Sequence, residues 1–137
     1  MPLPGPYSEC VLVRQESDVP AAMRMGRDLA QHCGFSRVNA MYIATAVTEL
    51  ASNLWIHAGG GVLTVEWLPQ LPGIEIRTQD NGPGIADVAL AMTDGYSTAG
   101  GLGCGLPGVE RLMDGLQIEP RPAGGTLVRA WKVAHHV

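Results

Sequence analysis

The 137-residue sequence predicts an α+β domain, a two-layer sandwich in which helices cover one face of a mostly antiparallel sheet. Two long segments carry apolar residues at helical spacing, and several short segments alternate apolar and polar residues as half-buried strands do. Turns rich in glycine and proline separate these segments. A chain of this length forms one domain and buries about 68% of its unfolded surface, so it needs no disulfide or metal to fold.

The N-terminal part of the chain predicts one strand and two helices. Residues 10–13 are expected to form a short strand. Ser17 and Asp18 are residue types that cap helix N-termini, and they precede an apolar pattern that ends at Gly34. A second helix is expected over residues 38–57, because apolar residues recur on one face and three glycines follow it.

The remaining sequence predicts a hairpin, then a glycine-rich region that contains two short helices and precedes two more strands. Apolar and polar side chains alternate on both sides of a proline-containing turn, which is typical of a hairpin. Residues 80–125 contain 11 glycines, and a long loop between the short helices is often functional in so compact a domain. The expected strands are 63–67, 74–77, 116–119 and 127–133, and the expected short helices are 88–92 and 107–113.

The charge composition excludes several classes of protein. Nine basic and 13 acidic residues give a net charge of −4, whereas nucleic-acid and anionic-membrane binders present basic surfaces. Lys132 is the single lysine and no glycine precedes it, so the phosphate-gripping motif of P-loop nucleotidases is absent. Zinc-protease, α/β-hydrolase and eukaryotic-type kinase motifs are absent as well. We therefore expect no nucleic-acid and no membrane partner.

Cysteine usage and hydropathy indicate a cytoplasmic protein. The chain has three cysteines, which are Cys10, Cys33 and Cys104. An odd number of widely spaced cysteines is typical of reduced thiols in a reducing compartment. The first residues lack the basic and apolar segments of a signal peptide. Polar residues interrupt the longest apolar stretch, at 40–58, so we expect a buried helix there and no membrane span.

Glu49 and Asn53 lie four residues apart, so they share one face of the expected second helix. With Thr45 and His57 they form a polar row beside the apolar stripe. A carboxylate can act as a general base, and a side-chain amide oxygen is a suitable ligand for Mg²⁺. The alternative is an ordinary solvated face of the helix.

Asp80 directly follows an expected strand and begins the segment Asp-Asn-Gly-Pro-Gly. Its carboxylate can accept a hydrogen bond from an exocyclic amine, and Gly82 and Gly84 leave room for a flat ligand. A plain turn is the alternative, because these residue types are common in turns.

Residues 100–108 form a second glycine-rich segment, which runs into an expected helix. Residues 103–108 match G-x-G-x-x-G, but a loop and not a strand precedes them, so a Rossmann site is not expected. Free backbone N–H groups at a helix N-terminus suit a polyphosphate, which favours a flexible lid. The alternative is a mobile surface loop.

Taken in order, four segments resemble the conserved boxes of the GHKL (Bergerat-fold) ATPase and kinase superfamily. This resemblance implies one ATP-binding kinase domain over residues 8–133. The second box follows an expected strand and the third precedes an expected helix, as in that superfamily. The boxes are Glu49-x-x-x-Asn53, Asp80-x-Gly82-x-Gly84, the glycine run 100–105 and Gly125-Thr126.

The resemblance implies a role for each matching residue. Glu49 would polarise the attacking hydroxyl group, and Asn53 would hold the Mg²⁺ that bridges the phosphates of ATP. Asp80 would accept a hydrogen bond from the adenine amino group, with Thr126 assisting. The remaining implied nucleotide-binding residues are Gly82 and Gly84 in the adenine pocket, and Gly101, Leu102, Gly103 and Gly105 in the lid over the phosphates.

The resemblance also bears on His57 and Arg111. Several anti-sigma kinases carry a histidine at the position of His57. Some relatives are expected to carry a cationic residue in the lid, whereas no Lys or Arg lies between Tyr96 and Glu110 here. Transition-state charge would then rest on Mg²⁺, backbone N–H groups and Arg111, which suits a slow kinase that acts as a switch.

Within the superfamily, residues 45–51, 79–85 and 94–114 resemble the switch serine/threonine kinases of bacterial partner-switching (stressosome) pathways. The resemblance implies a kinase that phosphorylates STAS-domain antagonist proteins and, when released, activates a type-2C protein phosphatase. One alternative is an anti-sigma factor that sequesters a sigma factor. Another is an ATP-binding regulatory protein without phosphotransfer, against which the presence of both Glu49 and Asn53 argues.

Overall fold

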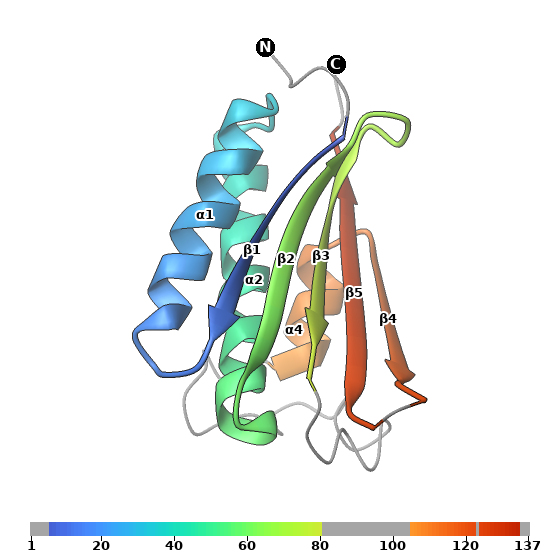
Figure 1. The fold of residues 1–137 in the computed structure, drawn as a ribbon. Helices are drawn as coiled ribbons and strands as arrows, with labels where there is room; N and C mark the ends of the chain where they lie inside the picture. Colours follow the sequence, from blue (N-terminus) through green and yellow to red (C-terminus); the bar gives the residue numbers. More distant parts are fainter. Residues whose placement is uncertain (1–5, 81–104, 123, 135–137) are drawn as a thin grey trace.

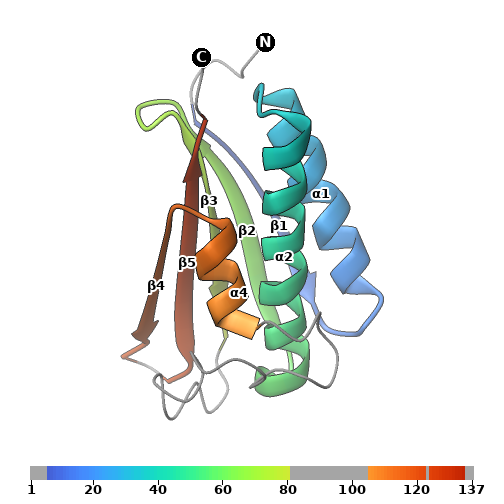
Figure 2. The same cartoon turned by 180° about the vertical axis from the view of Figure 1, so that it is seen from behind.

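The computed structural model describes residues 6–80, 105–122 and 124–134 and shows a five-stranded sheet covered on one face by helices (Figures 1 and 2). The strand order is β1-β2-β3-β5-β4, and all four pairings are antiparallel. The α+β sandwich predicted from the sequence is therefore confirmed. The elements are β1 (Tyr7–Val13), α1 (Asp18–His32), α2 (Arg37–Ala58), β2 (Gly61–Leu68), β3 (Gly73–Gln79), α4 (Gly105–Leu112), β4 (Gly115–Pro120) and β5 (Thr126–Val133). The helix expected at 88–92 lies outside the described residues.

Helix α2 has well-defined signals at both ends. The Ser36 hydroxyl accepts a hydrogen bond from the backbone N–H of Asn39 (3.1 Å), which caps the N-terminus. Gly59 ends the helix in the left-handed conformation, with φ of 74°, as the run of glycines predicted. The 22 residues between these signals carry the polar row of the candidate site.

The start of α1 differs from the prediction. Ser17 occupies the cap position, but its side chain makes no capping hydrogen bond. Asp18 is the first helical residue, and its carboxylate instead accepts the backbone N–H groups of Arg14 (2.8 Å) and Gln15 (3.2 Å). These contacts hold the segment that precedes the helix, whereas a cap would accept N–H groups of the first helical turn. The capping predicted for Ser17 and Asp18 is therefore not observed.

The sheet brings distant segments together because the last strand is inserted between β3 and β4. The predicted hairpin of β2 and β3 is confirmed, with Val62 opposite Gln79 and Leu68 opposite Gly73. Strand β5 then pairs with β3, so that Leu127 lies opposite Gln79. The residue after β3 therefore lies beside the first residue of β5.

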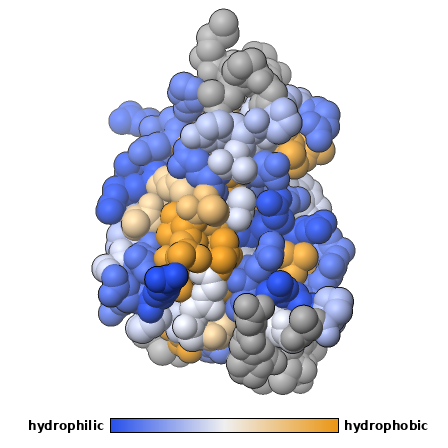
Figure 3. Space-filling model, in the orientation of Figure 1, coloured by the Kyte–Doolittle hydropathy of each residue, from blue (hydrophilic) through white to orange (hydrophobic). Residues whose placement is uncertain are grey.

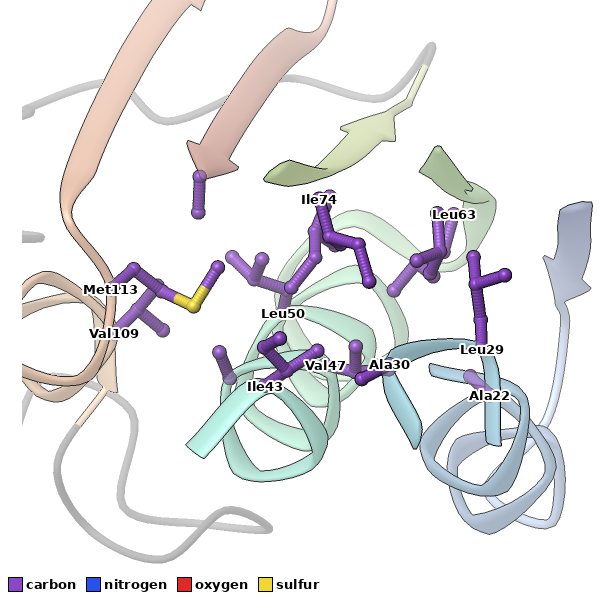
Figure 4. Close-up of a cluster of buried hydrophobic side chains, with 14 of the residues drawn as sticks. Ala22, Leu29, Ala30, Ile43, Val47, Leu50, Leu63, Ile74, Val109 and Met113 are labelled. Carbon is purple, nitrogen blue, oxygen red and sulfur yellow. The ribbon is translucent and has the colours of Figure 1, made fainter. Parts of the chain in front are cut away.

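The main core lies between the helices and the sheet, with α2 at its centre (Figure 4). Helix α1 packs on one side of α2 and helix α4 on the other. The fully buried side chains of α2 contact apolar residues from the sheet and from both flanking helices. Members labelled in Figure 4 include Leu29 from α1, Ile43, Val47 and Leu50 from α2, Leu63 and Ile74 from the sheet, and Val109 and Met113 from α4.

The opposite face of the sheet carries a mixture of polar and apolar residues (Figure 3). Arg77 donates to Glu66 (2.6 Å) and Glu75 (2.8 Å) there, and the hydrogen bond to Glu66 raises the pKa of the Arg77 guanidinium above its usual value. None of the described helices is long and apolar enough to cross a membrane.

The two serines that precede helices provide a matched pair for testing the capping contact. We predict that Ser36→Ala lowers the free energy of unfolding by about 1 kcal/mol, because it removes the cap of α2. Ser17→Ala, which removes no cap hydrogen bond, should change it by less than about 0.5 kcal/mol. Urea unfolding followed by circular dichroism measures both, and equal losses in the two variants would contradict the assignment.

Candidate functional site

The end of β3 and the start of β5 are joined by a reciprocal contact between Asp80 and Thr126. The Asp80 backbone N–H donates to the Thr126 carbonyl (3.2 Å), and the Thr126 backbone N–H donates to Asp80 Oδ2 (3.3 Å). Both residues are buried. The carboxylate of Asp80 is thus held in place by the backbone of the neighbouring strand.

Gly125 makes this contact possible. Its φ of 87° is one that residues with a side chain rarely adopt. A Cβ atom at this position would lie 1.9 Å from the Asp80 carbonyl oxygen and 3.0 Å from Oδ1. A glycine is therefore required before Thr126 for the two chain segments to approach this closely.

A cleft of about 450 Å³, counted with the open solvent at its mouth, adjoins this contact. The C-terminal ends of α2 and β3 and the N-terminal ends of α4 and β5 all lie at this end of the sandwich (Figure 1). The walls are mainly apolar and carry a few polar groups, which is typical of a small-molecule site. The lining residues are Leu50, Asn53, Leu54, His57, Ala58, Thr78, Asp80, Leu106, Thr126 and Val128.

The polar row of α2 passes from the core to the surface along the helix. Glu49 is 1% exposed, one turn before Asn53, while Asn53 is half-buried and His57 is exposed. The alternative of an ordinary solvated face is wrong for Glu49. Asn53 and His57 line the cleft, whereas Glu49 lies outside its lining.

The side chain of Asn53 has a feature that suits a metal ligand. Its Oδ1 atom is buried and accepts no hydrogen bond from the described residues. A buried acceptor without a donor is costly, and an amide oxygen is a ligand that Mg²⁺ accepts. Within the described ranges, no group of three or more His, Cys, Asp and Glu side chains could hold a metal ion. A Mg²⁺ ion held here through Asn53 would therefore need its other ligands from elsewhere, as Mg²⁺ that is shared with phosphates and water does.

The structure brings together several of the residues that the sequence singled out. Asn53, Asp80 and Thr126 lie around one cleft, and Gly105 begins the helix whose second residue, Leu106, lines it. Gly105 is buried and has φ of 56°. The other predicted residues, Gly82, Gly84, Gly101, Leu102 and Gly103, lie outside the described residues.

Sequence reasoning missed several contributors, among them Arg121 and much of the apolar lining of the cleft. Arg121, in the turn between β4 and β5, donates from Nη1 to the Asp80 carbonyl oxygen (2.7 Å). No local pattern marks such a contact, because the two residues are 41 positions apart in sequence. Leu106 forms an apolar wall of the cleft; its place directly before Pro107 in the glycine-rich segment was the available signal.

Comparison with known proteins shows the family to which this chain belongs. Residues 12–132 match the family model described as "Histidine kinase-like ATPase domain". The chain belongs to this family. The GHKL resemblance predicted from the four boxes is therefore confirmed.

The individual relatives are of two kinds. The chain is 42% identical over 125 residues to "Serine/threonine-protein kinase RsbT" of Bacillus subtilis, covering 90% of this chain and 94% of that protein. It is 36% identical over 96 residues to an "Anti-sigma F factor" of Caldanaerobacter subterraneus, covering 66% of this chain and 67% of that protein. The predicted resemblance to switch kinases thus extends over most of the chain.

A solved structure supports the fold. The crystal structure of the RsbU and RsbW domains of Rv1364c from Mycobacterium tuberculosis superposes with a TM-score of 0.69. The match covers 98% of this chain and 34% of that longer chain, at 16% sequence identity. At this identity the likeness establishes a shared fold.

Two adjacent glycines test the role of the close contact. Both Gly124 and Gly125 have positive φ, but a Cβ at Gly124 would meet nothing within 4 Å. We predict that Gly124→Ala costs about 1–2 kcal/mol from backbone strain alone, and that Gly125→Ala costs roughly 2–5 kcal/mol because overlap with Asp80 is added. Urea unfolding of both variants measures the difference. Equal losses would show that contact with Asp80 does not require the glycine.

Proposed function

We propose that this chain is an ATP- and Mg²⁺-dependent protein serine/threonine kinase of the bacterial partner-switching type. The observation that carries the proposal is the cleft whose lining includes both Asp80, with its carboxylate held by Thr126, and Asn53, with its unpartnered amide oxygen. The 42% identity to the kinase RsbT over nearly its whole length supports the same activity.

The cleft suits an adenine base. Its apolar walls accept a flat ring, and the buried carboxylate of Asp80 can accept a hydrogen bond from the exocyclic amino group. Thr126 lines the same cleft and fixes the orientation of that carboxylate. Gly82 and Gly84 are proposed to complete the adenine pocket.

We propose that the phosphates of ATP extend toward the N-terminus of α4 and the glycine-rich segment 100–108 that leads into it. Helix α4 begins at the cleft with Gly105 and Leu106, and no acidic residue occurs in its first turn. The unpaired N–H groups of a helix N-terminus attract anions. We assign Gly101, Leu102, Gly103 and Gly105 to the lid over the phosphates.

Asn53 is proposed to hold the metal ion. When bound, Mg²⁺ would neutralise phosphate charge. The buried and unpartnered Oδ1 atom of Asn53 is the group available for it on α2.

Glu49 is proposed as the catalytic residue. It lies one helical turn before Asn53 and outside the lining of the cleft, so it need not contact the nucleotide. Its carboxylate would accept the proton of a serine or threonine hydroxyl as that oxygen attacks the γ-phosphorus, with ADP leaving. General-base assistance of this kind contributes about 10²–10⁴-fold to the rate.

The proposed protein substrates are STAS-domain antagonists, and the proposed downstream partner is a type-2C protein phosphatase. The anti-sigma F factor relatives favour a second candidate, in which the chain sequesters a sigma factor. Affinity capture with immobilised chain separates the two. Retention of a STAS-domain protein supports the kinase proposal, and retention of a sigma factor alone supports the alternative.

Nucleotide selectivity tests the role of Asp80. We predict that Mg·ATP binds roughly 5- to 150-fold more tightly than Mg·GTP, because guanine presents a carbonyl where adenine presents an amine. Isothermal titration calorimetry measures both affinities. Equal affinities would overturn the assignment of Asp80 to the base.

A substitution at Glu49 separates binding from chemistry. We predict that Glu49→Gln binds ATP and the STAS-domain partner nearly as the wild type does, while phosphoryl transfer falls by about 10²–10⁴-fold. Transfer of label from γ-labelled ATP gives the rate, and calorimetry gives the affinity.

The matched control is Glu75→Gln, which removes a carboxylate from the opposite face of the sheet. It should leave the transfer rate unchanged. Wild-type transfer in Glu49→Gln would rule out the base assignment, and loss of ATP binding in that variant would instead assign Glu49 to the structure of the metal site.

A further inference from the structure

The turn between β4 and β5 carries an arginine that reaches back to the candidate site. Arg121 donates from Nη1 to the carbonyl oxygen of Asp80 at 2.7 Å, in a partly buried contact. A hydrogen bond from a charged donor in such a place is stronger than one between neutral groups. The guanidinium therefore restrains the main chain at Asp80.

The turn itself is closed by hydrogen bonds, so the arginine projects from a defined backbone. The N–H of Arg121 donates to the Gly125 carbonyl (3.0 Å), and the N–H of Gly124 donates to the Arg121 carbonyl (3.0 Å). The same turn continues directly into Thr126, which holds the Asp80 carboxylate. Asp80 is thus held at its carbonyl oxygen by Arg121 of this turn, and at its N–H and its carboxylate by the first residue of β5.

Arg121 does not line the main cleft; it lines a second hollow, with Gly60 and Gly61, that shares Ala58 and Asp80 with the cleft. The hydrogen bond from Arg121 to the Asp80 carbonyl oxygen links this residue to the lining of the main cleft.

We infer that Arg121 is a positioning residue for nucleotide selection, which fixes the Asp80 backbone and so aims the adenine-accepting carboxylate. This inference rests on the proposed function, because it assumes that adenine occupies the main cleft. It implies that Arg121 affects recognition of the base and not of the phosphates.

The test compares Arg121→Ala with the wild-type chain in calorimetric titrations with Mg·ATP, Mg·ADP, adenosine and Mg·GTP. We expect affinities for all three adenine ligands to fall by the same factor, about tenfold, and the preference for ATP over GTP to narrow. Arg121→Lys retains a charged donor and should recover most of the affinity. Arg24→Ala, which removes an exposed arginine from α1, is the control and should match the wild type.

The outcomes separate the inference from the proposal beneath it. If the wild type binds ATP and the affinity of Arg121→Ala for ATP lies within twofold of the wild-type value, the inference is wrong and the proposed function stands. A loss that grows from adenosine to ADP to ATP would overturn it too, because it would reveal a direct phosphate contact. If circular dichroism shows that Arg121→Ala does not fold, the same titrations are made with Arg121→Lys and Arg121→Gln. A preference for ATP over GTP that is unchanged in both variants overturns the inference. A wild-type chain that binds no adenine ligand would overturn both.

Discussion

The close approach of Asp80 to Gly125 and Thr126 is the contact on which the candidate site depends. It joins the end of β3 to the start of β5 through two hydrogen bonds that involve Asp80 and Thr126. The approach is so close that a single Cβ at Gly125 would overlap the Asp80 carbonyl. Because β5 is inserted between β3 and β4, residues 46 positions apart in sequence form one rigid end of the sheet. A carboxylate held in this way has a defined direction before any ligand arrives, which is the basis of preorganised recognition.

The helices contribute the other half of the site. Helix α2 is fixed by its central place in the core, so the residues near its C-terminal end have well-defined positions. Asn53 and His57 project from that end into the cleft, and the first turn of α4 closes another wall. The sheet thus supplies the groups suited to a base, and the helices supply the groups suited to metal and phosphates.

Much of the fold could be predicted from the sequence because its signals are local. Alternation predicted the β2–β3 hairpin, and the run from Gly59 ended α2 as expected. The boxes that place Asn53, Asp80 and Thr126 around one cleft were also visible as short motifs. The capping predicted at Ser17 failed because a cap depends on the backbone conformation of the residue as well as on its type. Ser17 and Ser36 look alike in sequence, yet only Ser36 has the extended backbone, with ψ of 161°, from which its hydroxyl can reach the helix.

The burial of Glu49 and the contact of Arg121 with Asp80 could not be predicted either, because both depend on the surrounding structure. A polar row on a helix is usually solvated, and packing against the helix decides how far each member is exposed. Glu49 is almost wholly buried while His57, two turns later, is exposed. Arg121 contributes through a partner that only the strand order brings near.

The measurement that tests the proposed activity most directly is phosphoryl transfer by the wild-type chain. The purified protein is mixed with γ-labelled ATP, Mg²⁺ and each STAS-domain protein encoded near its gene, with EDTA added to a parallel reaction. We predict that the label appears on a serine or threonine of one STAS-domain protein, and that EDTA abolishes the transfer. Tight ATP binding with the label remaining in ATP, or released only as inorganic phosphate, would contradict the kinase assignment and leave a nucleotide-binding regulatory protein.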